Sequence, residues 1–259
     1  MPCSVDSAAG LRVERDADLL RLTFDRPDRR NAFDGALLEA LAQALGTPDD
    51  DVRAVVVAGE GDAFCAGADL AWFVGEHDVP VLQRPEPRLV SRLFATLDAV
   101  PVPVVARVQG AAVGGGVGFA ALADVVVASE DATFQLAEVR VGLVPAMVAP
   151  YVARRIGPAR VREWALTAER IGAARAEAWG LVSAVVAPQR LDDEVERRLE
   201  LLRAGEPGAL RALKAFLRAA DGRAPADLRE QAVLAISGRL ADPAARARIA
   251  RFLAGRRDG

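Results

Sequence analysis

The sequence predicts an α/β fold in which parallel strands alternate with helices, followed by a helical C-terminal region. Four short runs, alternating or rich in β-branched residues, predict strands: residues 19–24, 53–58, 104–108 and 124–128. Helical patterns separate the first three, and right-handed crossovers between parallel strands bury both kinds of face. From residue 191 onward the periodicity is almost wholly helical. We therefore expect an α/β core over residues 1–190 and a helical region over residues 191–259.

Local signals place the individual helices. Asp34 can cap a first helix and Gly46 is expected to end it in the left-handed conformation, with a buried stripe formed by Leu37, Leu38, Leu41 and Leu45. A second helix is expected to bury Leu89, Leu93 and Leu97. Further helices are expected over residues 191–203, 208–219, 227–240 and 243–253. Residues 78–87, with three prolines, predict a mobile loop that shapes a pocket.

Composition excludes several classes of function. The chain has 259 residues, 33 basic against 36 acidic, two cysteines and one histidine. No Cys/His zinc site or disulfide framework is expected, and scattered arginines with a net charge of -3 argue against nucleic acid. Residues 1–20 lack an apolar signal segment, and the uncharged residues 141–153 are too short to cross a bilayer. We expect a cytoplasmic protein without a metal or membrane partner.

Familiar catalytic and nucleotide motifs are not satisfied. No serine lies in a G-x-S-x-G elbow, and His77 would have to serve as the base, so a serine hydrolase is disfavoured. The glycines at residues 114–118 do not form a dinucleotide fingerprint because Phe119 stands where glycine or alanine is needed. A P-loop is also missing. Cys65 is interpreted as a small apolar filler rather than a nucleophile.

Two turns built from small residues remain. The glycine triplet at residues 114–116 follows the strand at residues 104–108 and begins an apolar helix, where unpaired N–H groups and the helix dipole suit an anion. Close packing of a helix on a strand explains these glycines equally well. Residues 59–70 form a second small-residue turn after the strand at residues 53–58. If the two turns converge, one N–H from each would make an oxyanion hole.

Several motifs along the chain match one known family. They are R-P-x-x-x-N-A at residues 26–32, A-F-x-A-G-A-D at 63–69, V-x-G-x-x-x-G-G-G at 108–116, F-x-x-x-E at 134–138, L-T-x-x at 166–169 and A-x-x-x-G-L-V, which begins at 176 in A-E-A-W-G-L-V. Together they resemble the enoyl-CoA hydratase/isomerase, or crotonase, superfamily over nearly the whole chain.

The resemblance implies a spiral of ββα units with a C-terminal helical trimerisation region, as homotrimers or hexamers. It implies coenzyme A thioesters as substrates, with no separate cofactor, and a place in fatty acid metabolism. The implied catalytic groups are Glu138 and the backbone amides of Ala66 and Gly115. The implied contacts to the coenzyme A substrate are Arg26, Ala63, Ala66, Gly67, Ala68, Asp69, Leu70, Lys214 and Phe252. A solvated helix position explains Lys214 equally well.

The chain departs from the two-glutamate hydratase pattern, because Gly118 stands where the first catalytic glutamate would be. It is similar in this respect to a bacterial branch that includes methylglutaconyl-CoA-type hydratases. Glu138, flanked by apolar residues, is expected to have a raised pKa and to act alone. Arg140 could meet a dicarboxylic acyl chain, although a surface or ion-paired role is favoured. We expect a 2-enoyl-CoA hydratase, with an enoyl-CoA isomerase or a non-catalytic acyl-CoA-binding subunit as alternatives.

Overall fold

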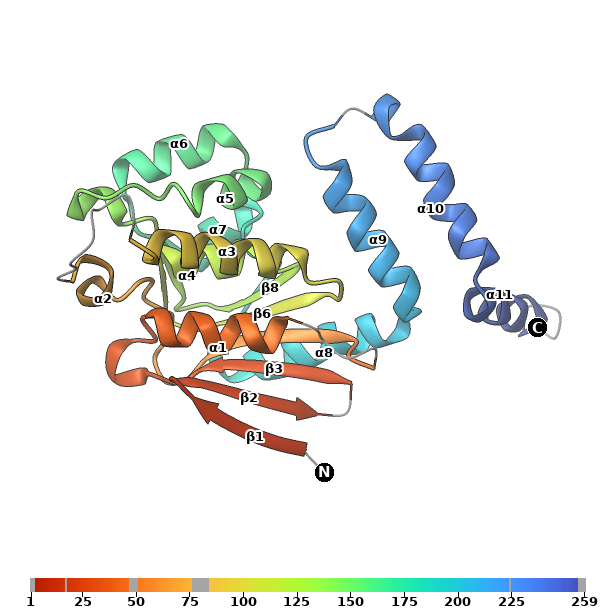
Figure 1. Cartoon of the computed structure of the whole chain (residues 1–259), viewed down its shortest axis with the longest axis horizontal. Coiled ribbons are helices and arrows are strands. Elements are labelled where there is room, and N and C mark those ends of the chain that lie inside the picture. The colour runs from red at the N-terminus through yellow and green to blue at the C-terminus, as the bar shows by residue number, and fades with distance from the viewer. Residues whose placement is uncertain (1–2, 17, 47–50, 76–83, 224, 256–259) are drawn as a thin grey trace.

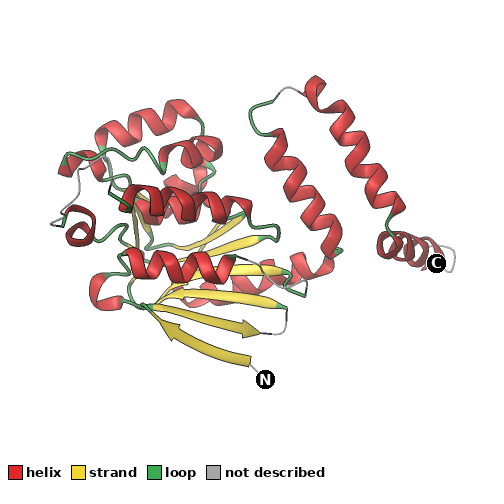
Figure 2. Ribbon diagram, in the orientation of Figure 1, coloured by secondary structure: helices red, strands yellow, loops and turns green. Residues whose placement is uncertain are grey.

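The computed structural model describes residues 3–16, 18–46, 51–75, 84–223 and 225–255. Seven strands form the large sheet, in the order β1 (Cys3–Ala8), β2 (Leu11–Asp16), β3 (Leu19–Phe24), β4 (Ala54–Gly59), β6 (Val104–Val108), β8 (Val125–Ser129) and β11 (Ala184–Val186). The first three strands are antiparallel, and from β3 onward each neighbour is parallel. Figures 1 and 2 show this sheet beneath a layer of helices.

A second sheet lies at the carboxyl ends of the central strands. It contains, in order, β10 (Ile171–Gly172), β9 (Thr133–Gln135), β7 (Ala111–Val113) and β5 (Ala63–Cys65). Each central strand of the large sheet therefore continues into a short strand of the small sheet before the next helix begins. This repeated unit confirms the predicted spiral of ββα units.

The helices of the first half are α1 (Gly35–Leu45), α2 (Leu70–Val74), α3 (Glu86–Ala99) and α4 (Gly115–Leu122). Those of the second half are α5 (Ala149–Ile156), α6 (Pro158–Thr167), α7 (Ala173–Trp179), α8 (Leu191–Ala204), α9 (Pro207–Ala220), α10 (Arg229–Ala241) and α11 (Pro243–Gly255). Short 3-10 turns are η1 (Pro27–Arg29), η3 (Glu138–Val141), η4 (Pro188–Arg190) and η5 (Pro225–Leu228).

Two apolar clusters cover the two faces of the large sheet. The larger one packs α1, α3 and α4 on one face, and the ring of Phe119 contacts those of both Phe24 and Phe33. The smaller one lies under α8, where Leu191, Val195 and Leu199 are buried against the opposite face. In Figure 1 the helices α9 to α11 extend away from this layered body.

The predicted elements are largely confirmed, with small corrections. The strand predicted at residues 53–58 runs from Ala54 to Gly59, and the strand predicted at 124–128 begins at Val125, because the Asp124 carboxylate accepts the Val104 N–H at 2.7 Å. The prediction that Gly46 ends α1 in the left-handed conformation is wrong, since its φ of -60° and ψ of -29° are those of a right-handed helix. Asp34 caps α1 as predicted, accepting the Leu37 N–H.

Two further predictions from the sequence are not fully confirmed. In α3 the buried stripe includes Leu93 and Leu97, but Val90 and Phe94 are buried where Leu89 was expected. Of the loop predicted at residues 78–87, positions 78–83 lie outside the described residues, and the last two positions belong to α3. None of the helices in the described ranges is long and apolar enough to cross a membrane.

Asn31 ties the segment before α1 to the turn after β4. Its side chain is fully buried, and its Nδ2 donates to the carbonyls of Glu60 at 2.9 Å and Ala63 at 2.7 Å. Its Oδ1 accepts the Arg26 N–H at 2.9 Å. The residue is held in the left-handed conformation, with φ of 58°. Every hydrogen-bonding atom of this amide is therefore used to fix the chain that leads into β5.

We expect Asn31→Ala to lower the free energy of unfolding by about 3 kcal/mol, because it leaves buried carbonyls and an N–H without partners. Denaturant unfolding followed by circular dichroism measures the loss. Arg30→Ala is the matched control, since Arg30 has a similar φ of 51° but an exposed side chain. If the two variants lost the same free energy of unfolding, the hydrogen bonds of Asn31 would contribute nothing to stability.

Candidate active site

A cavity of about 440 Å³ lies above the small sheet. Its walls come from the loop before α2, from α3, from the start of α4 and from the segment that joins η3 to α5. The volume lies in the range of small-molecule sites. Ala66, Gly115 and Glu138 all line this cavity, so the structure brings together the three groups that the sequence predicted to be catalytic.

The two small-residue turns meet at the cavity through backbone contacts. A Cβ atom on Gly116 would lie 2.1 Å from the carbonyl oxygen of Cys65, and one on Gly67 would lie 2.7 Å from that of Val113 and 3.3 Å from the Gly115 nitrogen. Only glycine permits such an approach. The sequence allowed two interpretations of the glycine triplet, an anion site or close packing. The close packing is confirmed, and it places the start of α4 beside the turn at Gly67.

The prediction that the Ala66 amide is an oxyanion donor is wrong. Its N–H already donates to the carbonyl of Arg30 at 2.9 Å. Ala68, two residues later, has a different geometry. It pairs with Phe33 in a parallel β-bridge. In this bridge the Gly67 carbonyl accepts the Phe33 N–H, and the Asp69 N–H donates to the Phe33 carbonyl. In such a bridge the N–H of Ala68 itself points away from Phe33.

Gly115 supplies a second backbone N–H beside this cavity. Gly114, with φ of 52°, precedes α4, and Gly115 is its first residue. The first N–H groups of a helix have no acceptor within the helix and carry the positive end of its dipole. Ala68 and Gly115 both line the cavity, so two N–H groups from different turns adjoin the same space.

The Glu138 carboxylate lies directly over Gly114. A Cβ atom on Gly114 would lie 2.9 Å from Glu138 Oε1. The Glu138 Oε2 atom is buried and has no hydrogen-bond partner among the described residues. Burial raises the pKa of the Glu138 carboxyl above its ordinary value, and a hydrogen bond from its own backbone N–H offsets part of the rise. A partly desolvated carboxylate with one unpartnered oxygen is suited to accept a proton from a bound molecule.

The position of the missing second acid is filled by apolar groups. A Cβ atom on Gly118 would lie 3.0 Å from Phe94 Cζ and 3.4 Å from Val148 Cγ1. Phe94 and Val148 line the cavity, whereas Gly118 does not. A ring therefore stands between Gly118 and the cavity, and no other carboxylate lines the cavity within the described chain.

Cys65 has the structural role that the sequence favoured. Its side chain is fully buried, and burial raises the pKa of its thiol to about 12. A thiol with this pKa is almost wholly protonated at neutral pH and is a poor nucleophile. Cys65 therefore acts as a small core residue beneath the turn.

The residues expected to contact coenzyme A divide into two groups. Gly67, Ala68 and Leu70 line the cavity. Ala63 is buried within β5 and does not line it. Asp69 caps α2 by accepting the Ala71 N–H at 2.9 Å.

The charged groups near this path are paired within the chain. Burial alone would raise the pKa of Asp69, but hydrogen bonds from the Trp72 amide and from Arg29 outweigh it and lower the pKa. Arg26 is mostly buried and forms an ion pair with Asp34 at 2.7 Å. A contact of Arg26 or Asp69 with coenzyme A thus stays a prediction.

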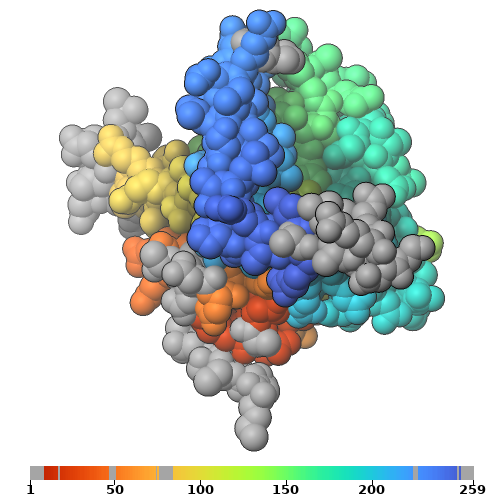
Figure 3. All heavy atoms as spheres, turned by 90° about the vertical axis from the view of Figure 1, so that its right-hand side faces the viewer, coloured from red at the N-terminus to blue at the C-terminus, as the bar shows by residue number. Residues whose placement is uncertain are grey.

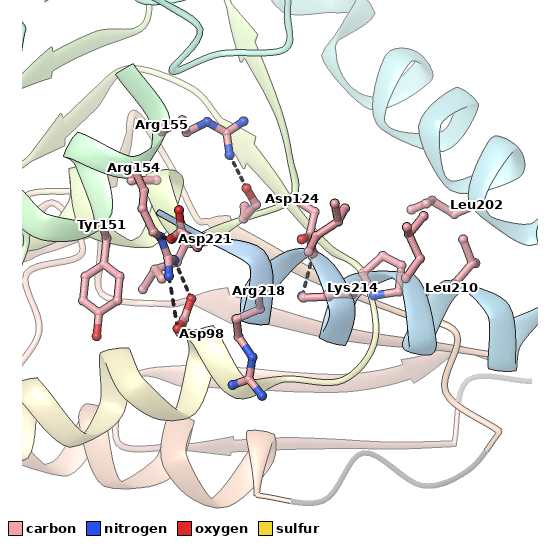
Figure 4. Close-up of a pocket in the computed structure, with 16 residues that line it drawn as sticks. Asp98, Asp124, Tyr151, Arg154, Arg155, Leu202, Leu210, Lys214, Arg218 and Asp221 are labelled. Carbon is pink, nitrogen blue, oxygen red and sulfur yellow. Dashed lines mark hydrogen bonds and ion pairs between the residues drawn. The ribbon is translucent and has the colours of Figure 1, made fainter. Parts of the chain in front are cut away.

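Lys214 lies at a second cavity, of about 570 Å³, between α9 and the core. Its Nζ donates to Asp124 Oδ2 at 2.6 Å (Figure 4). It also donates to the Val102 carbonyl at 2.8 Å. The structure therefore does not bring Lys214 to the cavity of Glu138 in the same chain. Phe252 belongs to α11, and its side chain lies outside the described residues.

The sequence of the chain also matches the profile of a known protein family. The profile of the enoyl-CoA hydratase/isomerase family matches residues 14–239, which includes every residue of the cavity. The chain belongs to this family.

Relatives of this hydratase/isomerase chain carry consistent names. A putative enoyl-CoA hydratase of Thermus thermophilus is 35% identical over 199 residues, covering 76% of this chain and 79% of the relative. The crystal structure of an enoyl-CoA hydratase from Mycobacterium smegmatis has 32% identity and a TM-score of 0.90, covering 95% of this chain and 96% of that one. A putative enoyl-CoA hydratase from Thermobifida fusca, in complex with acetoacetyl-CoA, has 32% identity and a TM-score of 0.81, covering 90% and 95%.

Three features of this hydratase/isomerase site were missed from the sequence. The first is Ala68, which lines the cavity and follows Gly67, whose φ is 89°. The second is Phe94, and nothing in the helical pattern of α3 marks it as the neighbour of Gly118. The third is the wall at residues 143–148, where Leu143, Pro145 and Met147 line the cavity. Pro145 in this region was a signal of non-helical chain.

We expect Gly114→Ala to reduce catalytic turnover by at least about 100-fold, because its methyl group would displace the Glu138 carboxylate. Gly157→Ala is the control, since Gly157 has a comparable φ of 87° but no neighbour within 4 Å. Steady-state assays on enoyl-CoA thioesters, with thermal melts of both variants, measure the two effects. Retained activity in Gly114→Ala would mean that the position of Glu138 does not matter.

Proposed function

We propose that this protein is an enoyl-CoA hydratase that uses a single carboxylate. The observation that carries the proposal is the buried, unpartnered Oε2 of Glu138, which lies at the cavity that the Ala68 and Gly115 N–H groups adjoin. A base and a pair of backbone donors at one cavity suit a reaction that passes through an enolate. The names of the relatives agree with this reaction class.

In this proposal the thioester carbonyl oxygen accepts hydrogen bonds from Ala68 and Gly115. Negative charge builds on this oxygen when a nucleophile adds to the double bond. The dipole of α4 and the two N–H groups stabilise that charge more than they stabilise the neutral substrate. One such donor is typically worth about 10²–10³ in turnover.

Glu138 carries the proton through the reaction. It takes a proton from water while the water oxygen bonds to C3, and the electrons of the double bond move to the thioester oxygen. The protonated Glu138 then returns this proton to C2 as the enolate collapses to the saturated thioester. Each atom of water is thereby added across the double bond, and Glu138 is regenerated.

An enoyl-CoA isomerase is the second candidate, favoured by the apolar surroundings of Glu138. No second carboxylate lines the described part of the cavity to hold a water molecule. Position 118 is a glycine, and Phe94 and Val148 cover it. A single carboxylate can instead move a proton between C4 and C2 of a 3-enoyl thioester. The same oxyanion hole would serve both reactions.

Coenzyme A enters this proposal as part of the substrate, with no separate cofactor. The Thermobifida fusca relative is described in complex with acetoacetyl-CoA. We propose that Gly67, Ala68 and Leu70 lie along the thioester end of the substrate. Lys214 and Phe252 are proposed to meet coenzyme A bound to a neighbouring subunit, since in this chain Lys214 faces the second cavity.

We expect Glu138→Gln to lower kcat by about 10²–10⁴ while acyl-CoA binding is retained. In the unmodified protein kcat/KM rises with pH as Glu138 ionises. Because burial raises the pKa of Glu138, this rise is expected above the usual pH range for a glutamate. Steady-state kinetics across pH and calorimetric binding of a saturated acyl-CoA measure both effects. Full activity in Glu138→Gln would rule out the proposal.

A substrate comparison separates the candidates. A hydratase removes the ultraviolet absorbance of 2-enoyl-CoA and incorporates ¹⁸O from labelled water. An isomerase converts 3-enoyl-CoA to 2-enoyl-CoA with no ¹⁸O incorporation. Binding of acyl-CoA without turnover of either substrate would indicate a non-catalytic binding subunit.

We also propose that the chain assembles as a trimer, or as a hexamer of stacked trimers, through its C-terminal helices. The helices α9 to α11, drawn in blue on the side of the molecule seen in Figure 3, carry apolar side chains that are exposed in the single chain. They are Leu213 and Leu217, which line the second cavity, and Val233, Leu234, Ile236, Leu240 and Ile249. Exposed apolar surface of this extent is typical of an interface.

We expect Leu234→Glu to reduce the mass of the particle toward that of a monomer, as measured by light scattering. Leu166→Glu on α6 is the control, because Leu166 is also exposed but lies outside the C-terminal helices. A monomeric unmodified protein would contradict the assembly.

A further inference from the structure

We propose that this site accepts an apolar acyl group without a second charge, and that Phe94, packed on Gly118, sets the preference. The inference rests on the proposed function, because it concerns the acyl half of the coenzyme A thioester. It opposes the dicarboxylic substrates suggested by the similarity to methylglutaconyl-CoA-type hydratases.

The walls of the cavity have almost no polar side chains. Among the lining residues that the structure describes, Glu138 is the only one that ionises, and the others are apolar or glycine. At the rim, apolar side chains that line the cavity are left open to solvent. Leu70 is 46% exposed, Val141 56% and Val144 69%. Covering such a surface with an apolar group lowers the free energy of the complex.

Within the described ranges, the arginines nearest to the cavity in sequence do not line it or are already paired. Arg140, on the same turn as Glu138, is exposed and does not line the cavity. Arg84, just before α3, does not line it either. Arg29 is paired with Asp69 at 3.0 Å and Arg26 with Asp34 at 2.7 Å.

A carboxylate on the acyl chain would therefore find no cationic partner among the lining residues that the structure describes. Its desolvation is unfavourable in apolar surroundings. Repulsion from Glu138 would add to this cost, because the two like charges would share one low-dielectric space. Both effects act on binding and do not depend on the chemical step.

Phe94 makes this apolar character a fixed property of the cavity. Its ring packs edge to face with Phe119 at 5.3 Å between centroids and with Tyr151 at 6.1 Å. On the Gly118 side, the distance of 3.0 Å from Phe94 Cζ to the Cβ position leaves no space for a larger residue. The ring therefore separates Gly118 from the acyl group, on the side where a second acid would otherwise face it.

The direct test compares two saturated acyl-CoAs of equal chain length, pentanoyl-CoA and glutaryl-CoA, by titration calorimetry on the full-length protein. We expect glutaryl-CoA to bind at least about tenfold more weakly. Equal or tighter binding of glutaryl-CoA would overturn the inference.

Two variants test the named determinants. Val144→Arg adds a cation at the rim and is expected to narrow the difference between the two ligands, whereas Leu166→Arg, which adds the same charge on α6, is expected to leave it unchanged. Gly118→Ala would push the Phe94 ring toward the cavity and weaken pentanoyl-CoA relative to acetyl-CoA. An unchanged ratio in Gly118→Ala would overturn the role of Phe94.

The same measurements keep this inference separate from the proposed function. If glutaryl-CoA binds as well as pentanoyl-CoA while Glu138→Gln still abolishes turnover, the acyl preference is wrong and the catalytic proposal stands. If neither thioester binds, the proposed function fails and the acyl preference fails with it.

Discussion

The site depends on a direct contact between two stretches of backbone, residues 59–67 and 110–116. A Cβ atom on Gly110 would lie 1.9 Å from the Asp62 carbonyl oxygen, and one on Gly116 would lie 2.1 Å from that of Cys65. Glycine at such positions lets two turns from neighbouring ββα units touch without side chains between them. Backbone atoms placed by packed strands on both sides have little freedom. The N–H groups of Ala68 and Gly115 are therefore held in position before any substrate binds, which is the condition for effective electrostatic stabilisation.

The same packing explains how the chain maintains an unfavourable carboxylate. A buried acid without a hydrogen-bond partner costs free energy. Glu138 lies against the start of α4, where the helix dipole favours negative charge, and this offsets part of the cost. The rest is balanced by the large apolar cluster around Phe24, Phe33 and Phe119. Stability from the core thus supports a reactive group at the surface of the cavity.

The sequence predicted the features that depend on local patterns. β-branched runs predicted the strand at residues 104–108, and Asp34 predicted the start of α1, because both signals act within a few residues. The strands β5 and β9 were missed, since three residues carry no readable period and are stabilised mainly by their neighbours in the small sheet. The family resemblance brought two adjoining turns together, but it gave Ala66, whose N–H donates to Arg30, where we propose Ala68. The direction of an N–H reverses from one extended residue to the next, and the positive φ of Gly67 alters it again, so only coordinates decide which amide faces the cavity.

The packing of Phe94 against Gly118 also constrains how this protein can change over evolutionary time. An acidic side chain introduced at position 118 alone would collide with the aromatic ring, and a smaller residue introduced at position 94 alone would leave a void in the core. Each single change therefore lowers the stability of the fold, whereas the two changes together can form a packed arrangement. The packing thus couples the two positions, so that the effect of an acid at position 118 depends on the residue at position 94.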